Sequence, residues 1–174
     1  MGASAKKAAF VNAFIESVIE AFESMVGARP RRTHVAATHT MDEGYGTSSV
    51  GAMVMTTAGP MLLCFSKGVA LRIMSALTGV EMSELNNEVL DGTRELANIL
   101  TGSAKSRLDS QGLNIDFELP QTRLGAFVKV DRKPNDYWIT IQFDSDAGQF
   151  FIQVPFMESL FKETAAGEQP ASAK

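Results

Sequence analysis

Hydrophobic residues recur every three or four positions in two long segments of the chain, which is the spacing of one face of an α-helix. In residues 8–26 the apolar stripe consists of Phe10, Phe14, Val18, Ala21, Phe22 and Met25. In residues 86–108 it consists of Val89, Thr93, Leu96, Leu100 and Ala104, with Leu90, Ala97 and Leu108 beside it. We therefore predict two long amphipathic helices, and Gly27 supplies a stop for the first.

Shorter apolar segments bounded by turn residues predict β-strands between and after these helices. The segments are residues 34–41, 48–57, 61–66, 124–130, 137–143 and 149–154, with 113–119 as a further extended segment. Short helices are expected at residues 69–77 and from Pro155. A long helix, three strands and a short helix thus occur once and recur in the same order roughly eighty residues later.

This repeat of pattern predicts an α+β fold. We expect a two-layer domain with a pseudo-two-fold helix–three-strand–helix repeat, in which the long helices pack on one side of an antiparallel sheet. A single domain should span residues 8–163. Residues 1–7 and 164–174 are small or polar, and we expect them to form disordered tails.

The composition and net charge of the chain argue against several classes of function. A net charge of −4 argues against a nucleic-acid partner, and the short basic cluster of Arg29, Arg31 and Arg32 is interpreted as cations near a helix C-terminus. No segment approaches the ~20 apolar residues of a membrane span, and no signal peptide is expected. The single cysteine, Cys64, lies in an apolar run and is predicted to be a buried hydrophobe in a reducing compartment. We expect a cytoplasmic protein.

A polar ridge opposite the apolar stripe of the second long helix carries the candidate chemistry. Its residues lie at i, i+4, i+7, i+11 and i+14: Asp91, Glu95, Asn98, Gly102 and Lys105. Glycine inside a helix costs about 1 kcal/mol relative to alanine, but it would allow another surface to approach the backbone closely. The ridge is either an ordinary solvated face or a docking surface on which Glu95 pairs with a cation and Asn98 holds a water molecule.

Other catalytic patterns are weak. The segment around Gly44 lacks the spacing and the lysine of a phosphate-binding loop. His34 and His39 are an odd number of residues apart, so on one strand they would point to opposite faces. We predict no metal site in this chain.

The motif Asp91-x-x-x-Glu95-x-x-Asn98, followed at a distance by Pro120, resembles the signature of the CheC, CheX and FliY phosphatases of bacterial chemotaxis. The surrounding sequence ELANILTGSAK is especially similar to the CheX branch. The resemblance covers residues 8–163, because the repeated layout of helices and strands is also that of the family.

The resemblance implies a phosphatase that acts on the aspartyl-phosphate of a CheY-type response regulator. Glu95 would anchor to a lysine of the regulator, and Asn98 would orient the attacking water in line with the acyl phosphate. Gly102 and Lys105 would lie along the docking surface, with Asp91 at its other end. The chain would need no cofactor of its own, since the Mg²⁺ belongs to the regulator.

The sequence of the first long helix indicates how many active sites to expect in each chain. Aligned by pattern, Asn12, Glu16 and Ile19 stand where the second helix has its Asp–Glu–Asn motif. The amide is replaced by isoleucine, so we expect one active site per chain, as in CheX, and the resemblance also implies a homodimer. The alternative is a non-catalytic adaptor or flagellar-switch-like module that binds a regulator. The retained Asn98 favours the phosphatase, since an adaptor would not need the amide.

Overall fold

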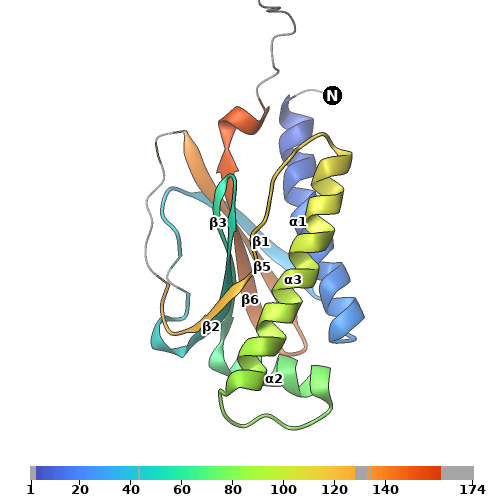
Figure 1. Ribbon diagram of the computed structural model, residues 1–174, viewed down its shortest axis with the longest axis vertical. Helices are drawn as coiled ribbons and strands as arrows, with labels where there is room; N and C mark the ends of the chain where they lie inside the picture. The colour runs from blue at the N-terminus through green and yellow to red at the C-terminus, as the bar shows by residue number, and fades with distance from the viewer. Residues whose placement is uncertain (1–2, 43, 128–132, 134, 162–174) are drawn as a thin grey trace, which may run out of the picture.

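The computed structural model describes residues 3–42, 44–127, 133 and 135–161. Helices pack on one side of an antiparallel sheet, as predicted (Figure 1). The helices are α1 (Ala3–Met25), α2 (Lys67–Thr78) and α3 (Asn87–Ser110), with 3₁₀ turns η1 (Gly46–Ser48) and η2 (Glu158–Phe161). The strands are β1 (Arg31–Thr38), β2 (Ser49–Thr56), β3 (Gly59–Ser66), β4 (Gln121–Leu124), β5 (Asp136–Ser145) and β6 (Gly148–Met157).

The strand order carries the predicted pseudo-two-fold symmetry. The six-stranded sheet runs β1-β5-β6-β3-β2-β4, so β3 and β6 form the central pair and the two halves mirror each other in order. Strand β1 of the first half pairs with β5 of the second, and β4 of the second half pairs with β2 of the first. Each half therefore contributes one edge strand to the hairpin of the other, which ties the two halves into one domain.

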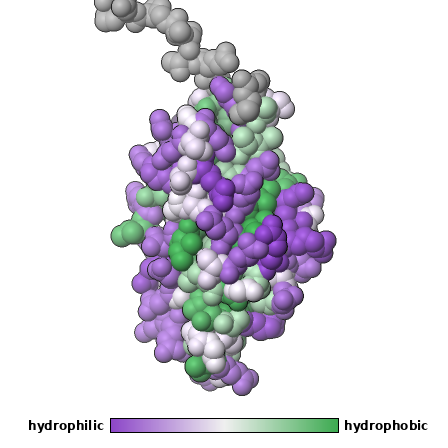
Figure 2. All heavy atoms as spheres, turned by 90° about the vertical axis from the view of Figure 1, so that its right-hand side faces the viewer, coloured by the Kyte–Doolittle hydropathy of each residue, from purple (hydrophilic) through white to green (hydrophobic). Residues whose placement is uncertain are grey.

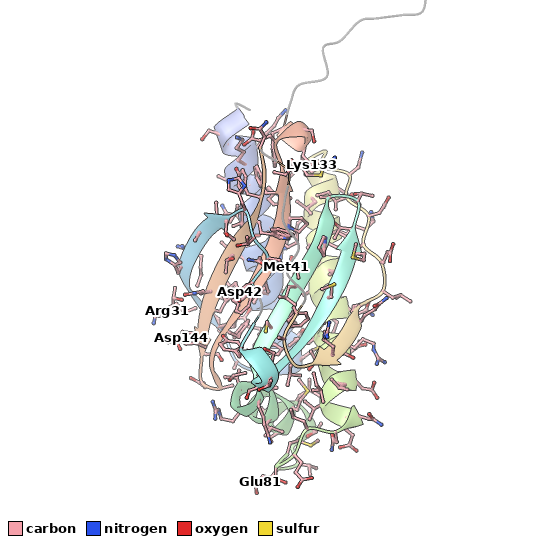
Figure 3. All side chains as sticks on the ribbon, turned by 90° about the vertical axis from the view of Figure 1, so that its left-hand side faces the viewer. Arg31, Met41, Asp42, Glu81, Lys133 and Asp144 are labelled. Atoms are coloured by element: carbon pink, nitrogen blue, oxygen red, sulfur yellow. The ribbon has the colours of Figure 1, made fainter. Side chains whose placement is uncertain are left out.

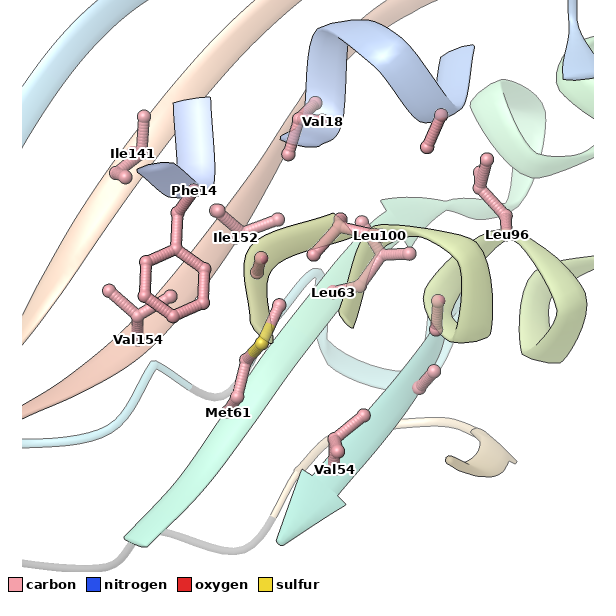
Figure 4. Packing of buried hydrophobic residues seen from close by; sticks show 14 of the residues in the cluster. Phe14, Val18, Val54, Met61, Leu63, Leu96, Leu100, Ile141, Ile152 and Val154 are labelled. Carbon is pink, nitrogen blue, oxygen red and sulfur yellow. The ribbon is translucent and has the colours of Figure 1, made fainter. Parts of the chain in front are cut away.

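The main core lies between the sheet and the long helices (Figure 4). Phe14 and Val18 of α1 and Leu96 and Leu100 of α3 are buried there. All five residues of the predicted α3 stripe are fully buried, including Thr93, whose hydroxyl donates to the Val89 carbonyl at 2.7 Å. Burial of one apolar stripe fixes which face of α3 is left for solvent.

No α-helix of the described structure lies on the other side of the sheet, where the segment with Met41 and Asp42 crosses the strands (Figure 3). A second cluster forms there from Met41, Leu62, Cys64, Phe127, Trp138 and Phe151. Cys64 is fully buried, as predicted, and that burial raises the pKa of its thiol to about 12. A neutral, inaccessible thiol is a packing residue.

Several boundaries differ from the predictions. Helix α1 begins at Ala3, not at residue 8, and Lys7 in the expected tail forms an ion pair of 2.8 Å with Glu158. Strand β6 continues through Pro155 to Met157, and the expected last helix is only the 3₁₀ turn η2. This is possible because a strand tolerates a proline whose missing N–H is not needed by the ladder.

Two other segments also depart from expectation. Residues 113–119 make only an isolated bridge, between Phe117 and Thr56, instead of a strand. Strand β4 shares only Leu124 with the predicted strand 124–130, because the chain turns at Gly125, whose φ of 89° suits glycine. Residues 128–130 and the predicted tail 164–174 lie outside the described residues.

The arginine cluster is divided between two elements. Arg31 and Arg32 begin β1, and Arg31 pairs with Asp144 of β5 at 3.4 Å (Figure 3). Arg29 follows α1 and pairs with Glu23 of its last turns at 2.6 Å. Only Arg29 therefore fits the predicted role at a helix C-terminus. Within the described ranges, no helix is long and apolar enough to cross a membrane.

Candidate active site on helix α3

Local contacts hold the N-terminal half of α3 in place. The Asn86 side chain caps the helix by accepting from the Val89 amide at 3.0 Å. Helix α2 packs so closely that a Cβ at Gly92 would collide with the sulfur of Met74. Gly92 thus leaves room for the buried Met74 side chain, next to the start of the ridge at Asp91.

The predicted ridge is exposed along most of its length. Asp91, Glu95, Asn98 and Gly102 are exposed, and Lys105 is half-buried. The side of the molecule that carries α1 and α3 faces the viewer in Figure 2, where hydrophilic residues surround small hydrophobic patches. The structure therefore brings the five predicted residues together on one accessible surface.

Glu95 and Asn98 differ from Asp91 and Lys105 of the same ridge, whose side chains form ion pairs. Among the described residues, neither the Glu95 carboxylate nor the Asn98 carboxamide has a hydrogen bond or ion pair. The Asn98 backbone carbonyl accepts from the Thr101 hydroxyl at 3.1 Å, but the Asn98 side chain takes no part in this contact. One carboxylate and one amide, a turn apart on a rigid helix, are available to a partner.

Gly102 has no structural explanation within the fold. A Cβ at this position would meet nothing within 4 Å, and alanine would favour the helix by about 1 kcal/mol. Gly92 and Gly102 thus lie on the same helix for different reasons. The first leaves room for the Met74 side chain inside the protein, whereas the second has open space around it.

Lys105 has an intramolecular role in addition to its place on the ridge. Its ammonium group lies 3.0 Å from the Asp116 carboxylate, 3.7 Å from that of Asp109 and 3.3 Å from the Ile115 carbonyl. The hydrogen bond to Asp116 is the main cause that raises the pKa of Lys105. Lys105 fastens the end of α3 to the segment that leads to β4, and contact with a partner stays a prediction.

Arg94 is the residue near the motif that the sequence pattern did not single out. Its guanidinium lies 3.0 Å from the Asp91 carboxylate, and the two side chains are 52% and 64% exposed. Because side chains four residues apart on a helix are neighbours, Arg94 also stands beside Asn98. The spacing of Asp91 and Arg94, three residues apart on a helix, could have indicated this pair from the sequence.

The equivalent ridge of α1 is engaged. Arg107 of α3 lies 2.9 Å from Glu16 and 2.8 Å from Glu20, and the Ser103 hydroxyl also donates to Glu20. The hydrogen bonds from Ser103 and Arg107 lower the pKa of the Glu20 carboxyl. Ile19 lies where α3 has its amide. The α1 ridge is part of the contact between the helices, which supports one site per chain.

Pro120 is buried directly before β4. The next residue, Gln121, pairs with Met53 of β2, one of the strands that pack against α3. In the described part of the chain, no group of three or more His, Cys, Asp or Glu side chains is placed to hold a metal ion.

Comparison with known proteins decides the family. Residues 50–144, which contain the whole ridge, match the family model described as chemotaxis phosphatase CheX. The chain belongs to the CheX family. The resemblance predicted from the Asp91, Glu95 and Asn98 motif is therefore confirmed.

Individual relatives agree with this assignment. The chain is 26% identical over 124 residues to a CheY-P phosphatase CheX from Thermotoga maritima, covering 71% of this chain and 80% of the relative. The CheX crystal structure from Vibrio vulnificus is 27% identical, with a TM-score of 0.69, and the match covers 83% of this chain and 96% of that one. A CheX–CheY–BeF₃–Mg²⁺ complex from Borrelia burgdorferi has the same fold, with 15% identity, a TM-score of 0.61 and coverage of 85% and 97%.

Proposed function

We propose that this CheX-family protein is a phosphatase that hydrolyses the aspartyl-phosphate of a CheY-type response regulator. The observation that carries the proposal is the pair of exposed, unengaged side chains Glu95 and Asn98 on a firmly packed α3. It is supported by the Thermotoga maritima relative, which is named a CheY-P phosphatase. The Borrelia burgdorferi relative has been crystallised with CheY.

The chemistry assigned to this pair is positioning. The carboxamide of an asparagine is neither a nucleophile nor a useful general base, but its oxygen and nitrogen can hold a water molecule by hydrogen bonds. Asn98 would orient that water for in-line attack on phosphorus, and Glu95 would anchor to a lysine of the regulator. Holding reactants in line is a major part of catalysis in phosphoryl transfer. The regulator would supply the Mg²⁺, which neutralises developing charge on the phosphoryl group.

The rest of the ridge would serve docking. Gly102 leaves the helix backbone open to close approach. Asp91 and Lys105 lie at the two ends of this surface. Asp91 forms an ion pair with Arg94, and Lys105 forms one with Asp116. Contacts between exposed charges contribute mainly to the association rate and the orientation of docking.

We also propose a homodimer that acts in the cytoplasm, where a CheY-type partner would be found. The edge strands β1 and β4 each pair with one neighbour within the described sheet, and an open strand edge can pair with a second chain. Light scattering after size-exclusion chromatography would measure the mass. A monomeric mass at micromolar concentration would contradict the dimer and leave the phosphatase proposal intact.

The decisive experiment follows the decay of a phosphorylated CheY-type regulator with and without the protein. We expect wild type to accelerate the decay, and Asn98→Ala to lose about 10²-fold in rate while still binding the regulator. Glu95→Ala should lose both affinity and rate. If wild type binds the phosphorylated regulator without shortening its lifetime, the protein is an adaptor and the phosphatase proposal is wrong.

A further inference from the structure

Helix α3 has three basic side chains, and the structure gives them different partners. Lys105 is bound to Asp109 and Asp116, and Arg107 is bound to Glu16 and Glu20 of α1. Both therefore hold α3 to other parts of the fold. Arg94 pairs with Asp91 of its own helix, and it has no other ion pair among the described residues.

Arg94 is also a neighbour of Asn98 on the helix surface. It precedes Asn98 by four residues, so their Cβ atoms are about 5–6 Å apart on the helix surface. A guanidinium presents several N–H donors in a planar fork that matches phosphate oxygens. If Asn98 orients the water that attacks phosphorus, the Arg94 side chain can reach the oxygens of the same phosphoryl group.

Charge supplies the second argument. The first turns of α3 carry the exposed acids Glu88, Asp91 and Glu95, and an aspartyl-phosphate is also negative. A cation on this part of the helix would offset the repulsion between them, in addition to the Mg²⁺ that the regulator would supply. The pair of Arg94 and Asp91 is solvent-exposed, so it is weak and opens at little cost.

We propose that Arg94 is the phosphate-recognition residue of this protein, exchanging Asp91 for the phosphoryl oxygens of the regulator when the two proteins dock. This inference rests on the proposed function and extends it. Arg94 gives the protein its preference for the phosphorylated regulator over the unphosphorylated one. In the free protein Asp91, one turn before Arg94, pairs with the guanidinium, and docking would release it toward Asn98, one turn after Arg94.

The test is equilibrium binding of a CheY-type regulator, with and without beryllofluoride as a stable phosphoryl mimic. We expect Arg94→Ala to weaken binding of the beryllofluoride form about 10-fold to 100-fold. Binding of the unmodified regulator should change by less than about two-fold, since the phosphoryl contact is absent there. Arg94→Lys should recover part of the loss, because a point charge replaces the fork. Arg29→Ala is the matched control, since Arg29 is also an exposed arginine whose guanidinium pairs with one nearby acid, Glu23, at 2.6 Å.

The outcomes separate this inference from the function on which it rests. Equal loss for both forms, or no loss for either, would overturn the assignment of Arg94 while wild type still accelerates phosphate decay. Wild type that neither binds the regulator nor accelerates decay would overturn the proposed function and this inference with it. Thermal unfolding of Arg94→Ala should match wild type, because the side chain is exposed.

Discussion

Helices α1 and α3 hold equivalent places in the two halves of the fold, but their polar ridges differ in what they contact. On α3, Glu95 and Asn98 point to solvent without partners in the described structure. On α1, Glu16 is held by Arg107 and the amide position is occupied by Ile19. The α1 ridge stabilises the contact between helices, whereas Glu95 and Asn98 of the α3 ridge have no such contact in the described structure.

The difference shows that the symmetry of the backbone does not extend to the chemistry. An acid at the same helical position is an anchor only when nothing within the protein neutralises it. Arg107 comes from α3 itself, so the helix that carries the proposed site also occupies the acids of its counterpart. Fold alone does not assign function, and side-chain partners decide between two equivalent surfaces.

The largest expected effect is a difference in regulator binding between variants of Glu95 on α3 and of Glu16 on α1. Glu95→Gln should weaken binding of a phosphorylated CheY-type regulator about 10-fold to 100-fold, because a charged contact at a docked surface is lost. Glu16→Gln, the same change on α1, should alter binding by less than about two-fold. Isothermal titration of both variants measures this. Similar losses for the two variants would mean that both ridges dock.

The two glycines of α3 provide a comparison within one helix. Gly92→Val should destabilise the protein by about 1–3 kcal/mol, because the added side chain would overpack the contact with Met74 of α2. Chemical denaturation gives this free energy of unfolding. An unchanged stability would show that α2 moves aside without cost.

Gly102→Ala should act in the opposite direction. With open space around the position, the substitution should stabilise the helix by up to about 1 kcal/mol. Phosphatase activity should nevertheless fall, because the added methyl group stands between the ridge and the docked regulator. A variant with raised stability and full activity would show that close approach at Gly102 is not needed.

The smallest expected effect concerns the ion pairs between Arg107 of α3 and the acids Glu16 and Glu20 of α1. Because hydrogen bonds lower the pKa of Glu20 in the folded state, their stabilisation is present above the ordinary pKa of a glutamate. It is lost as the pH falls through the lowered value. Arg107→Gln should cost about 0.5 kcal/mol at neutral pH, since these side chains are largely exposed. Denaturation at pH 7 and pH 3 should show a smaller difference from wild type at the acidic pH.

The elements and the motif could be read from the sequence because both depend on local spacing. Burial of one stripe of α3 determines which side chains are exposed, and the period of the helix then aligns Asp91, Glu95, Asn98 and Gly102. The same reasoning predicted the buried Cys64 and the repeat of helix and strands. It placed the start of α1 and the range of β4 less well, because ends depend on caps and contacts that have no period.

Tertiary structure decided everything that depends on residues far apart in the chain. The exchange of β1 and β4 between halves requires pairings such as Val35 with Ile141, which no local pattern specifies. The same holds for the ion pair of Glu16 with Arg107, for that of Lys105 with Asp116, and for the close approach of Met74 to Gly92. Spacing along one helix shows which side chains share a face, but only packing against the rest of the fold determines which of them remain free.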